Sequence, residues 1–244
     1  LLVYSFVFLL SELLCFYIFN NCRSVFRMPD YIDKKVLITG ASRGLGYVAA
    51  KAFASSSATL YLAARSEDKL VALQSKLPNN QRHRIFAGDL TTSGNINMLV
   101  KDCLQELGTP DVILHCMGGG LGMRDALLGQ DELKALFMTN LSGGAEINRL
   151  LFPEMIKNDG GYVVHIGSTA SAEAIASVGY NTVKAALAAY VRSLGNEYAN
   201  SKIILTGIMP GAFYAPQNSW HRLEDKNPEV VKNFINQRLP RGRI

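Results

Sequence analysis

The feature that most constrains the fold is a regular alternation, from residue 35 onward, of short apolar runs with longer segments of helical periodicity. Runs such as VLI at 36–38 and VIL at 112–114 are continuously apolar, which is typical of strands buried on both faces of a sheet. Strands that alternate with helices predict a parallel sheet with helices on both sides. We therefore predict a single α/β domain with a doubly wound parallel sheet, in which ligands bind beyond the carboxyl ends of the strands.

The predicted elements follow one another in the order of a Rossmann-type fold. The predicted strands cover 35–39, 59–63, 84–87, 111–115, 162–166 and 203–207. The predicted helices cover 44–55, 67–76, 96–107, 131–157, 180–198 and 228–237. The residues that follow each strand are therefore the first place to look for a site.

Length and composition exclude several other classes of protein. The chain has 244 residues, which is enough for one substantial domain with an appendage. A hydrophobic content of 48% excludes a disordered chain, and only four cysteines exclude a disulfide scaffold. Those cysteines, at positions 15, 22, 103 and 116, lack metal-ligand spacing, so we expect reduced thiols and no metal site. The net charge of +5 is scattered, which does not favour a nucleic-acid partner.

The first 27 residues differ in character from the rest of the chain. Residues 1–19 are almost all apolar, apart mainly from Glu12, and Arg23 and Arg27 follow them. One interpretation is a membrane anchor near the lower length limit, with the main domain on the cytoplasmic side. The other is an artefact of an upstream start, with Met28 as the initiator. We therefore predict a segment 1–27 and a domain 28–244, cytoplasmic, or membrane-associated and facing the cytoplasm if the segment is genuine.

A glycine-rich loop follows the first predicted strand and opens the first predicted helix. Glycines let the chain turn sharply and let backbone N–H groups approach a pyrophosphate, and the helix N-terminus adds partial positive charge. The spacing T-G-x-x-x-G-x-G resembles the short-chain dehydrogenase/reductase family, closest to its 3-oxoacyl-carrier-protein reductase-like branch. The resemblance implies cofactor contacts from Gly40, Ser42, Arg43, Gly44, Leu45 and Gly46.

The residue after the second strand indicates which dinucleotide is bound. A carboxylate there would hydrogen-bond the ribose 2′-hydroxyl, whereas an arginine can pair with a 2′-phosphate. The sequence has Ala64 and Arg65, with no acid before Glu67. Arg43 in the glycine loop is a second cation, and NADP-preferring family members have basic residues at both places. We therefore expect NADP(H) as the cofactor.

The resemblance implies further cofactor contacts after other strands. Asp89 and Leu90 match the family residues that enclose adenine, and Pro210 and Gly211 match the pair beside the nicotinamide. The threonine usual four residues after that glycine is replaced by Ala215.

The segment after the fourth strand departs from the family. The usual Asn-Asn-Ala-Gly reads His115, Cys116, Met117 and Gly118. The retained glycine lets the backbone pass close to the cofactor, so Cys116, Met117 and Gly118 are predicted cofactor contacts. We interpret His115 as a buried polar brace rather than a proton donor.

Four residues form the predicted catalytic group. Tyr180 and Lys184 share one face of a helix, and a nearby ammonium lowers the pKa of a phenol. The resemblance implies that both also contact the cofactor. It further implies that Ser168, twelve residues before Tyr180, bonds the substrate oxygen and that Asn140 supports a proton relay.

These features predict an NADP(H)-dependent oxidoreductase that transfers hydride between nicotinamide and a carbonyl or secondary alcohol, with a 3-oxoacyl thioester as one candidate substrate. The alternatives are a membrane-tethered reductase of lipophilic carbonyls, such as steroids or retinoids, and a dinucleotide-binding protein without turnover. Residues 212–235 should form a substrate lid, with Phe213, Tyr214 and Trp220 either contacting substrate or packing. The family's last helix and strand have no counterpart before Ile244, so we expect a C-terminally truncated domain, and a homo-oligomer only with a full-length chain.

Overall fold

The computed structural model describes residues 31–244. The predictions for segment 1–27, including the anchor, its alternative start and two of the cysteines, lie outside the described residues. None of the helices within 31–244 combines the length and the apolar character that crossing a membrane requires.

The core of the molecule is a parallel sheet of six strands in the order β3-β2-β1-β4-β5-β6. The sheet and its flanking helices confirm the predicted doubly wound α/β fold. The order reverses between β1 and β4, and such a switch point is where open α/β sheets bind ligands. The strands are β1 (Lys35–Thr39), β2 (Thr59–Ala64), β3 (Arg84–Ala87), β4 (Val112–His115), β5 (Gly161–Ile166) and β6 (Ile203–Ile208).

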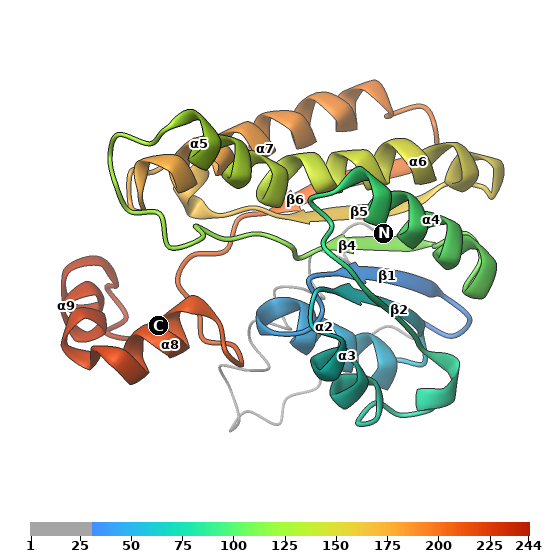
Figure 1. The fold of residues 1–244 in the computed structure, drawn as a ribbon, viewed down its shortest axis with the longest axis horizontal. Coiled ribbons are helices and arrows are strands. Elements are labelled where there is room, and N and C mark those ends of the chain that lie inside the picture. The colour runs from blue at the N-terminus through green and yellow to red at the C-terminus, as the bar shows by residue number, and fades with distance from the viewer. Residues whose placement is uncertain (1–30) are drawn as a thin grey trace.

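Helices cover the two faces of the sheet unequally (Figure 1). Helices α2 and α3 lie on one face, while α4, α6 and α7 lie on the other, and each side has its own apolar cluster. The last two helices, α8 and α9, stand apart from these layers beside the strand ends (Figure 1). The helices are α2 (Gly44–Ser55), α3 (Glu67–Gln74), α4 (Ser93–Glu106), α5 (Gln130–Phe137), α6 (Gly143–Lys157), α7 (Val178–Glu197), α8 (Ser219–Lys226) and α9 (Pro228–Arg238).

Two helix predictions need correction. The segment predicted as one helix over 131–157 is two helices, α5 and α6, joined by a π-helical turn, η2 (Met138–Ser142). Such a single turn lies within an otherwise helical segment, and the apolar pattern on each side of it still reads as helix, so the sequence does not reveal it. Helix α8 was not predicted because it has only eight residues and two apolar side chains, Trp220 and Leu223, which are too few for a helical period to stand out.

Two short 3₁₀ turns, η1 (Asn80–Arg82) and η3 (Thr169–Ser171), complete the described elements. The second of these lies directly after β5, in the loop that carries Ser168.

Candidate active site

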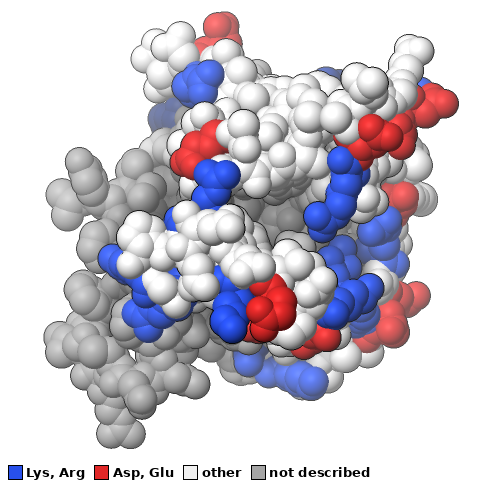
Figure 2. All heavy atoms as spheres, turned by 90° about the vertical axis from the view of Figure 1, so that its left-hand side faces the viewer, with Lys and Arg blue, Asp and Glu red and all other residues white. Residues whose placement is uncertain are grey.

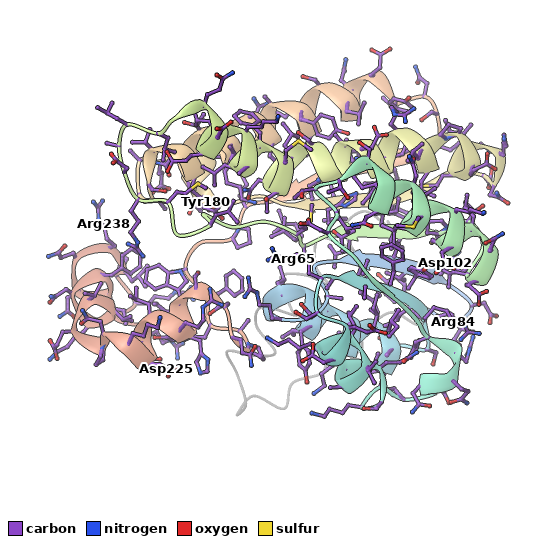
Figure 3. All side chains as sticks on the ribbon, viewed as in Figure 1. Arg65, Arg84, Asp102, Tyr180, Asp225 and Arg238 are labelled. Atoms are coloured by element: carbon purple, nitrogen blue, oxygen red, sulfur yellow. The ribbon has the colours of Figure 1, made fainter. Side chains whose placement is uncertain are left out.

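The predicted site residues gather at the carboxyl ends of the strands. Figure 3 shows Tyr180 and Arg65 toward the side of the sheet where α8 and α9 lie, and Arg84 and Asp102 toward the opposite side. This is the arrangement expected because the carboxyl ends of parallel strands meet at one edge.

The glycine loop lies against the chain that follows β4. Gly40 has a φ of 70°, and a Cβ there would stand 2.8 Å from the backbone carbon of Cys116 and from the backbone nitrogen of Met117. Only glycine fits such a turn and such an approach. The backbone of the predicted cofactor residues after β1 and after β4 is thereby brought together at the switch point.

One backbone N–H of the glycine loop is already hydrogen-bonded within the protein. The backbone N–H of Gly44, the first residue of α2, donates to the carbonyl of Pro216 at 2.8 Å. The segment before α8 therefore lies against the start of α2, next to the place where a pyrophosphate would be bound.

Two exposed arginines stand at the end of β2 and in the glycine loop, as predicted. Partial desolvation lowers the pKa of the Arg43 guanidinium, and the positive charges of Arg222 and Arg65 lower it further. Among the described residues, no carboxylate forms an ion pair with any of these three arginines. Figure 2, which looks onto the side where α8 and α9 lie, shows several basic side chains across its lower half, with some acidic ones among them. This end of the site is suited to an anion.

The residues predicted to enclose adenine have local structural roles in this structure. One carboxylate oxygen of Asp89 accepts from the backbone N–H of Thr91 at 3.0 Å and from its hydroxyl at 2.8 Å. Leu90 is 2% exposed and packs in the core on the α4 side. Their contacts with a cofactor stay predictions.

Ser168, Tyr180 and Lys184 converge beside the end of β5. Burial raises the pKa of the Tyr180 phenol, contrary to the lowering expected from Lys184, and a hydrogen bond from the Ser168 hydroxyl offsets only part of the rise. The Lys184 ammonium lies 5.6 Å from the centre of the Tyr180 ring and donates to the carbonyl of Ile166 at 2.9 Å. Burial lowers the pKa of Lys184 to about 8. The three groups thus form one proton-handling cluster, in which Lys184 is buried and Ser168 and Tyr180 are half-buried.

Asn140 lies in the π-helical turn and fastens the loop after β4. Its amide oxygen accepts from Gly119 N–H at 2.9 Å, and its amide nitrogen donates to the carbonyls of Gly119 at 3.0 Å and Leu136 at 2.9 Å. A Cβ on Gly118 would stand 2.9 Å from that amide oxygen and 3.3 Å from the Lys184 nitrogen. The retained glycine therefore has a steric reason, because the loop passes directly over Asn140 and Lys184.

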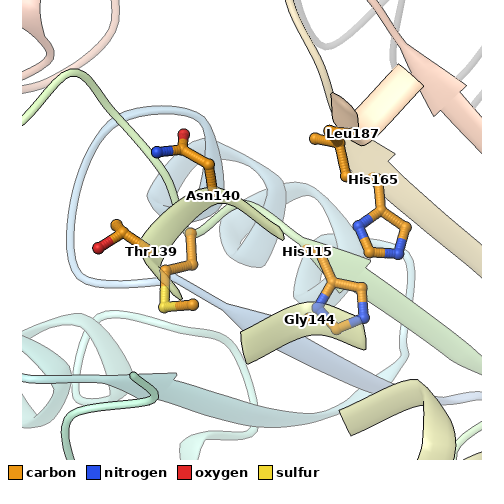
Figure 4. A pocket seen from close by; sticks show the side chains of 7 residues that line it. His115, Thr139, Asn140, Gly144, His165 and Leu187 are labelled. Atoms are coloured by element: carbon orange, nitrogen blue, oxygen red, sulfur yellow. The ribbon is translucent and has the colours of Figure 1, made fainter. Parts of the chain in front are cut away.

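A small cavity of about 10 Å³ lies beneath this turn (Figure 4), close to the space that one water molecule needs. The rings of His115 and His165 lie on one side of it, and Thr139 and Asn140 lie on the other. The two rings stack with their centres 4.4 Å apart.

The histidine pair is hydrogen-bonded through a residue that the sequence did not single out. The side chain of Asn148 accepts from His115 at 3.0 Å and donates to His165 at 3.0 Å and to the Tyr190 hydroxyl at 3.1 Å. Burial lowers the pKa of His115 to about 4 and also lowers that of His165. The prediction that His115 is a buried polar brace agrees with this network. Asn148 and His165 were missed because nothing in their local sequence distinguishes them from ordinary helix and strand residues.

The chain after β6 borders the site from the other side. Pro210 is buried, and its carbonyl accepts from Thr169 N–H at 3.1 Å, which ties it to the loop that carries Ser168. Gly211 is exposed, with open space where a Cβ would be. Trp220 packs on Phe234 with ring centres 4.4 Å apart, so the packing interpretation holds for this aromatic.

The described residues do not form a candidate metal site. Within residues 31–244, no group of three or more histidine, cysteine, aspartate or glutamate side chains is placed to hold a metal ion. Cys103 and Cys116 are free thiols, and burial raises the pKa of each to about 12.

Comparisons with known proteins agree with this fold. A family model described as short chain dehydrogenase matches residues 34–226. The chain is 30% identical over 220 residues to a glucose 1-dehydrogenase of Gluconobacter oxydans, covering 87% of this chain and 80% of that protein. It is 29% identical to the ketoacyl reductase HetN of a Nostoc species, covering 75% of this chain and 65% of that one. Among solved structures, L-sorbose reductase from Gluconobacter frateurii, complexed with NADPH and L-sorbose, superposes with a TM-score of 0.79 at 23% identity, covering 87% of this chain and 84% of that one.

Proposed function

This chain belongs to the short-chain dehydrogenase family of oxidoreductases, and we propose that it uses NADP(H) to interconvert a carbonyl compound and a secondary alcohol. The observation that carries the proposal is the convergence of Ser168, Tyr180 and Lys184 in one partly buried cluster next to the glycine loop. A protein that only bound a dinucleotide would not need three proton-handling groups there.

Each residue of the cluster has a separate role in proton transfer. In reduction, the Tyr180 hydroxyl donates its proton to the substrate oxygen, and the raised pKa of this phenol keeps it protonated at neutral pH. The Ser168 hydroxyl bonds the same oxygen and polarises it. The nearby ammonium of Lys184 stabilises the phenolate that remains after transfer.

Asn140 is a positioning residue in this scheme. Its side chain forms hydrogen bonds to the backbone of Gly119 and Leu136, and these bonds hold the 118–120 loop in place over Lys184. This loop separates the catalytic lysine from the glycine loop and would line the nicotinamide side of the cofactor.

The phosphate end of the site fits NADP(H). Gly40 allows the close backbone approach that a dinucleotide needs, and Arg43 and Arg65 have no acidic partner among the described residues. These two guanidinium groups would hold the 2′-phosphate. When bound, the nicotinamide supplies or accepts the hydride. The L-sorbose reductase of similar fold is described with NADPH, which supports the same choice.

A 3-oxoacyl thioester is the substrate class that we propose first. The Nostoc relative is a ketoacyl reductase, and a 3-oxoacyl-(acyl-carrier-protein) reductase from Agrobacterium tumefaciens with NADP bound has a similar fold, with a TM-score of 0.78. The net charge of +5 would favour an acidic carrier. A sugar is the competing substrate class, because the Gluconobacter relative is a glucose dehydrogenase.

The test begins with the cofactor and then compares substrates. The full chain is titrated with NADPH and with NADH while cofactor fluorescence is followed. We expect NADPH to bind about tenfold more tightly, and Arg65→Ala to remove most of that preference. Equal affinity for both cofactors would contradict the NADP(H) proposal.

Turnover is then measured with an acetoacetyl thioester, a ketose and a steroid ketone, each with NADPH. Reduction of the thioester alone supports the proposed substrate, and reduction of the sugar or steroid alone overturns it. Binding of NADPH without turnover of any carbonyl would favour the non-catalytic alternative.

A further inference from the structure

The lid is anchored on the cofactor end of the site rather than on the catalytic end. Besides the bond from Gly44 to Pro216, the Lys69 ammonium on α3 donates to the side-chain oxygen of Gln217 at 3.3 Å. A Cβ placed on Gly44 would lie 3.8 Å from the Cβ of Asn218. The segment 216–218 therefore sits between the glycine loop and the start of α3.

Side-chain hydrogen bonds hold the start of α8 at this place. Asn218 caps the helix by accepting from His221 N–H at 2.9 Å and donates to the carbonyl of Phe213 at 2.6 Å. One turn into the helix, Arg222 donates to the carbonyl of Gln217. Its guanidinium is thereby directed back over the anchored segment toward the glycine loop.

Three guanidinium groups consequently share one exposed region. They come from the glycine loop, the end of β2 and α8, at Arg43, Arg65 and Arg222. Lys69 adds a fourth positive charge at the edge. Like charges repel, and no carboxylate within the described residues is paired with these arginines. A doubly charged anion placed among them would relieve the repulsion and gain charge-assisted hydrogen bonds.

We propose that Arg222 is a third ligand of the 2′-phosphate of NADP(H), so that the lid recognises the phosphate directly. This inference rests on the proposed use of NADP(H). It adds a specificity-determining residue on α8, far along the chain from Arg43 in the glycine loop and Arg65 at the end of β2.

It follows that the identity of the bound cofactor determines how well ordered the lid is. Trp220 and Phe234 join α8 to α9 by ring packing, so that fixing α8 also fixes α9. NADP(H) should therefore order the lid more strongly than NAD(H), which lacks the phosphate, and substrate would be covered only when the correct cofactor is bound.

Arg222→Ala in the full chain tests this inference, with Arg238→Ala on α9 as the matched control. Figure 3 shows Arg238 at the end of α9, away from Arg65, and Arg238 is not among the charges that act on Arg43. We expect NADPH to bind Arg222→Ala about five- to tenfold more weakly, with NADH affinity and Arg238→Ala unchanged within about twofold. Equal weakening of NADPH and NADH, or no weakening, would overturn the inference.

Hydrogen exchange provides a second readout that a merely structural role would not move. Saturating NADPH should slow amide exchange across 213–226 more than saturating NADH does, and the difference should vanish in Arg222→Ala but persist in Arg238→Ala. Identical protection by both cofactors in the unmodified chain would also overturn the inference.

Failure of the inference can be told from failure of the proposed function. If the unmodified chain prefers NADPH, and Arg65→Ala loses the preference while Arg222→Ala keeps it, only the role of the lid arginine is wrong. If the unmodified chain shows no preference, the NADP(H) proposal itself fails, and the inference fails with it.

Discussion

The catalytic end and the phosphate end of the candidate site are built in opposite ways. Lys184 and Asn140, at the catalytic end, are only 3% and 5% exposed and have hydrogen bonds to the backbone. At the phosphate end, Arg43, Arg65 and Arg222 are all exposed and have no acidic partner among the described residues.

This difference follows from what each end has to do. Proton transfer needs groups whose pKa values are shifted, and burial is what lowers the pKa of Lys184 and raises that of Tyr180. Phosphate recognition needs permanent charges that a soluble ligand can reach. The catalytic end should therefore respond to volume and pH, and the phosphate end to charge and salt.

The largest effect is expected from removing the phenolic hydroxyl. Tyr180→Phe should lower kcat by about 10²- to 10⁴-fold, because the proton donor is lost while the ring still packs. NADPH affinity, measured by fluorescence titration, should change little. Tyr198→Phe, at the end of the same helix, is the control and should keep full activity. Turnover within about threefold of the unmodified chain would show that Tyr180 is not the proton donor.

Adding a single methyl group at Gly118 should also lower activity, because it disturbs the catalytic end of the site. In Gly118→Ala, the added Cβ would collide with the Asn140 amide and crowd the Lys184 ammonium, so kcat should fall by about 10- to 100-fold. Gly122→Ala shares the positive φ but meets open space, and it separates backbone strain from collision. If both variants lose activity equally, strain in the loop is responsible and the proposed crowding is not.

The pH dependence of kcat/KM should follow the ionisation of the buried Lys184 ammonium. As pH rises through about 8, Lys184 loses its proton and no longer stabilises the phenolate, so kcat/KM for reduction should fall. Tyr180 remains protonated in this range because burial raises its pKa. Initial rates with an active carbonyl substrate between pH 6 and 10 measure this, with circular dichroism to exclude unfolding. A flat profile up to about pH 9.5 would contradict the assignment.

The smallest effect is expected at the exposed end. Raising NaCl from about 50 to 500 mM should weaken NADPH binding about three- to tenfold, because exposed charges are screened. NADH binding and kcat at saturating NADPH should change by less than about twofold, since the catalytic groups are buried or half-buried. Equal salt sensitivity of both cofactors would remove the distinction between the two ends.

Much of the architecture could be predicted because it is encoded locally. Each predicted strand begins within one residue of the observed one, since continuous apolar runs bounded by turn residues specify buried strands. The start of α2 after the glycine loop was predicted for a similar reason, because glycine spacing marks the turn. The π-helical turn was not, because one additional residue per turn does not disturb the apolar pattern enough to be seen.

The candidate site likewise combines features that are encoded locally in the sequence with features that depend on tertiary packing. The sequence by itself determined the residue types and their order: the glycine loop, Arg65, Ser168 and the Tyr180–Lys184 pair, each placed at a strand end or on a helix face by local periodicity. It could also suggest that His115 is a brace, but not what it braces against.

Only the tertiary structure decided the surroundings that set the chemistry. Asn148 between two histidines, Asn140 on Gly119, and Arg222 near Arg43 all join residues that lie far apart in the chain. Burial and charge proximity depend on which elements pack together, and they determine pKa values that no local pattern contains. The sequence therefore specifies which groups are present, and packing specifies which are desolvated, which are braced and which remain exposed to an anion.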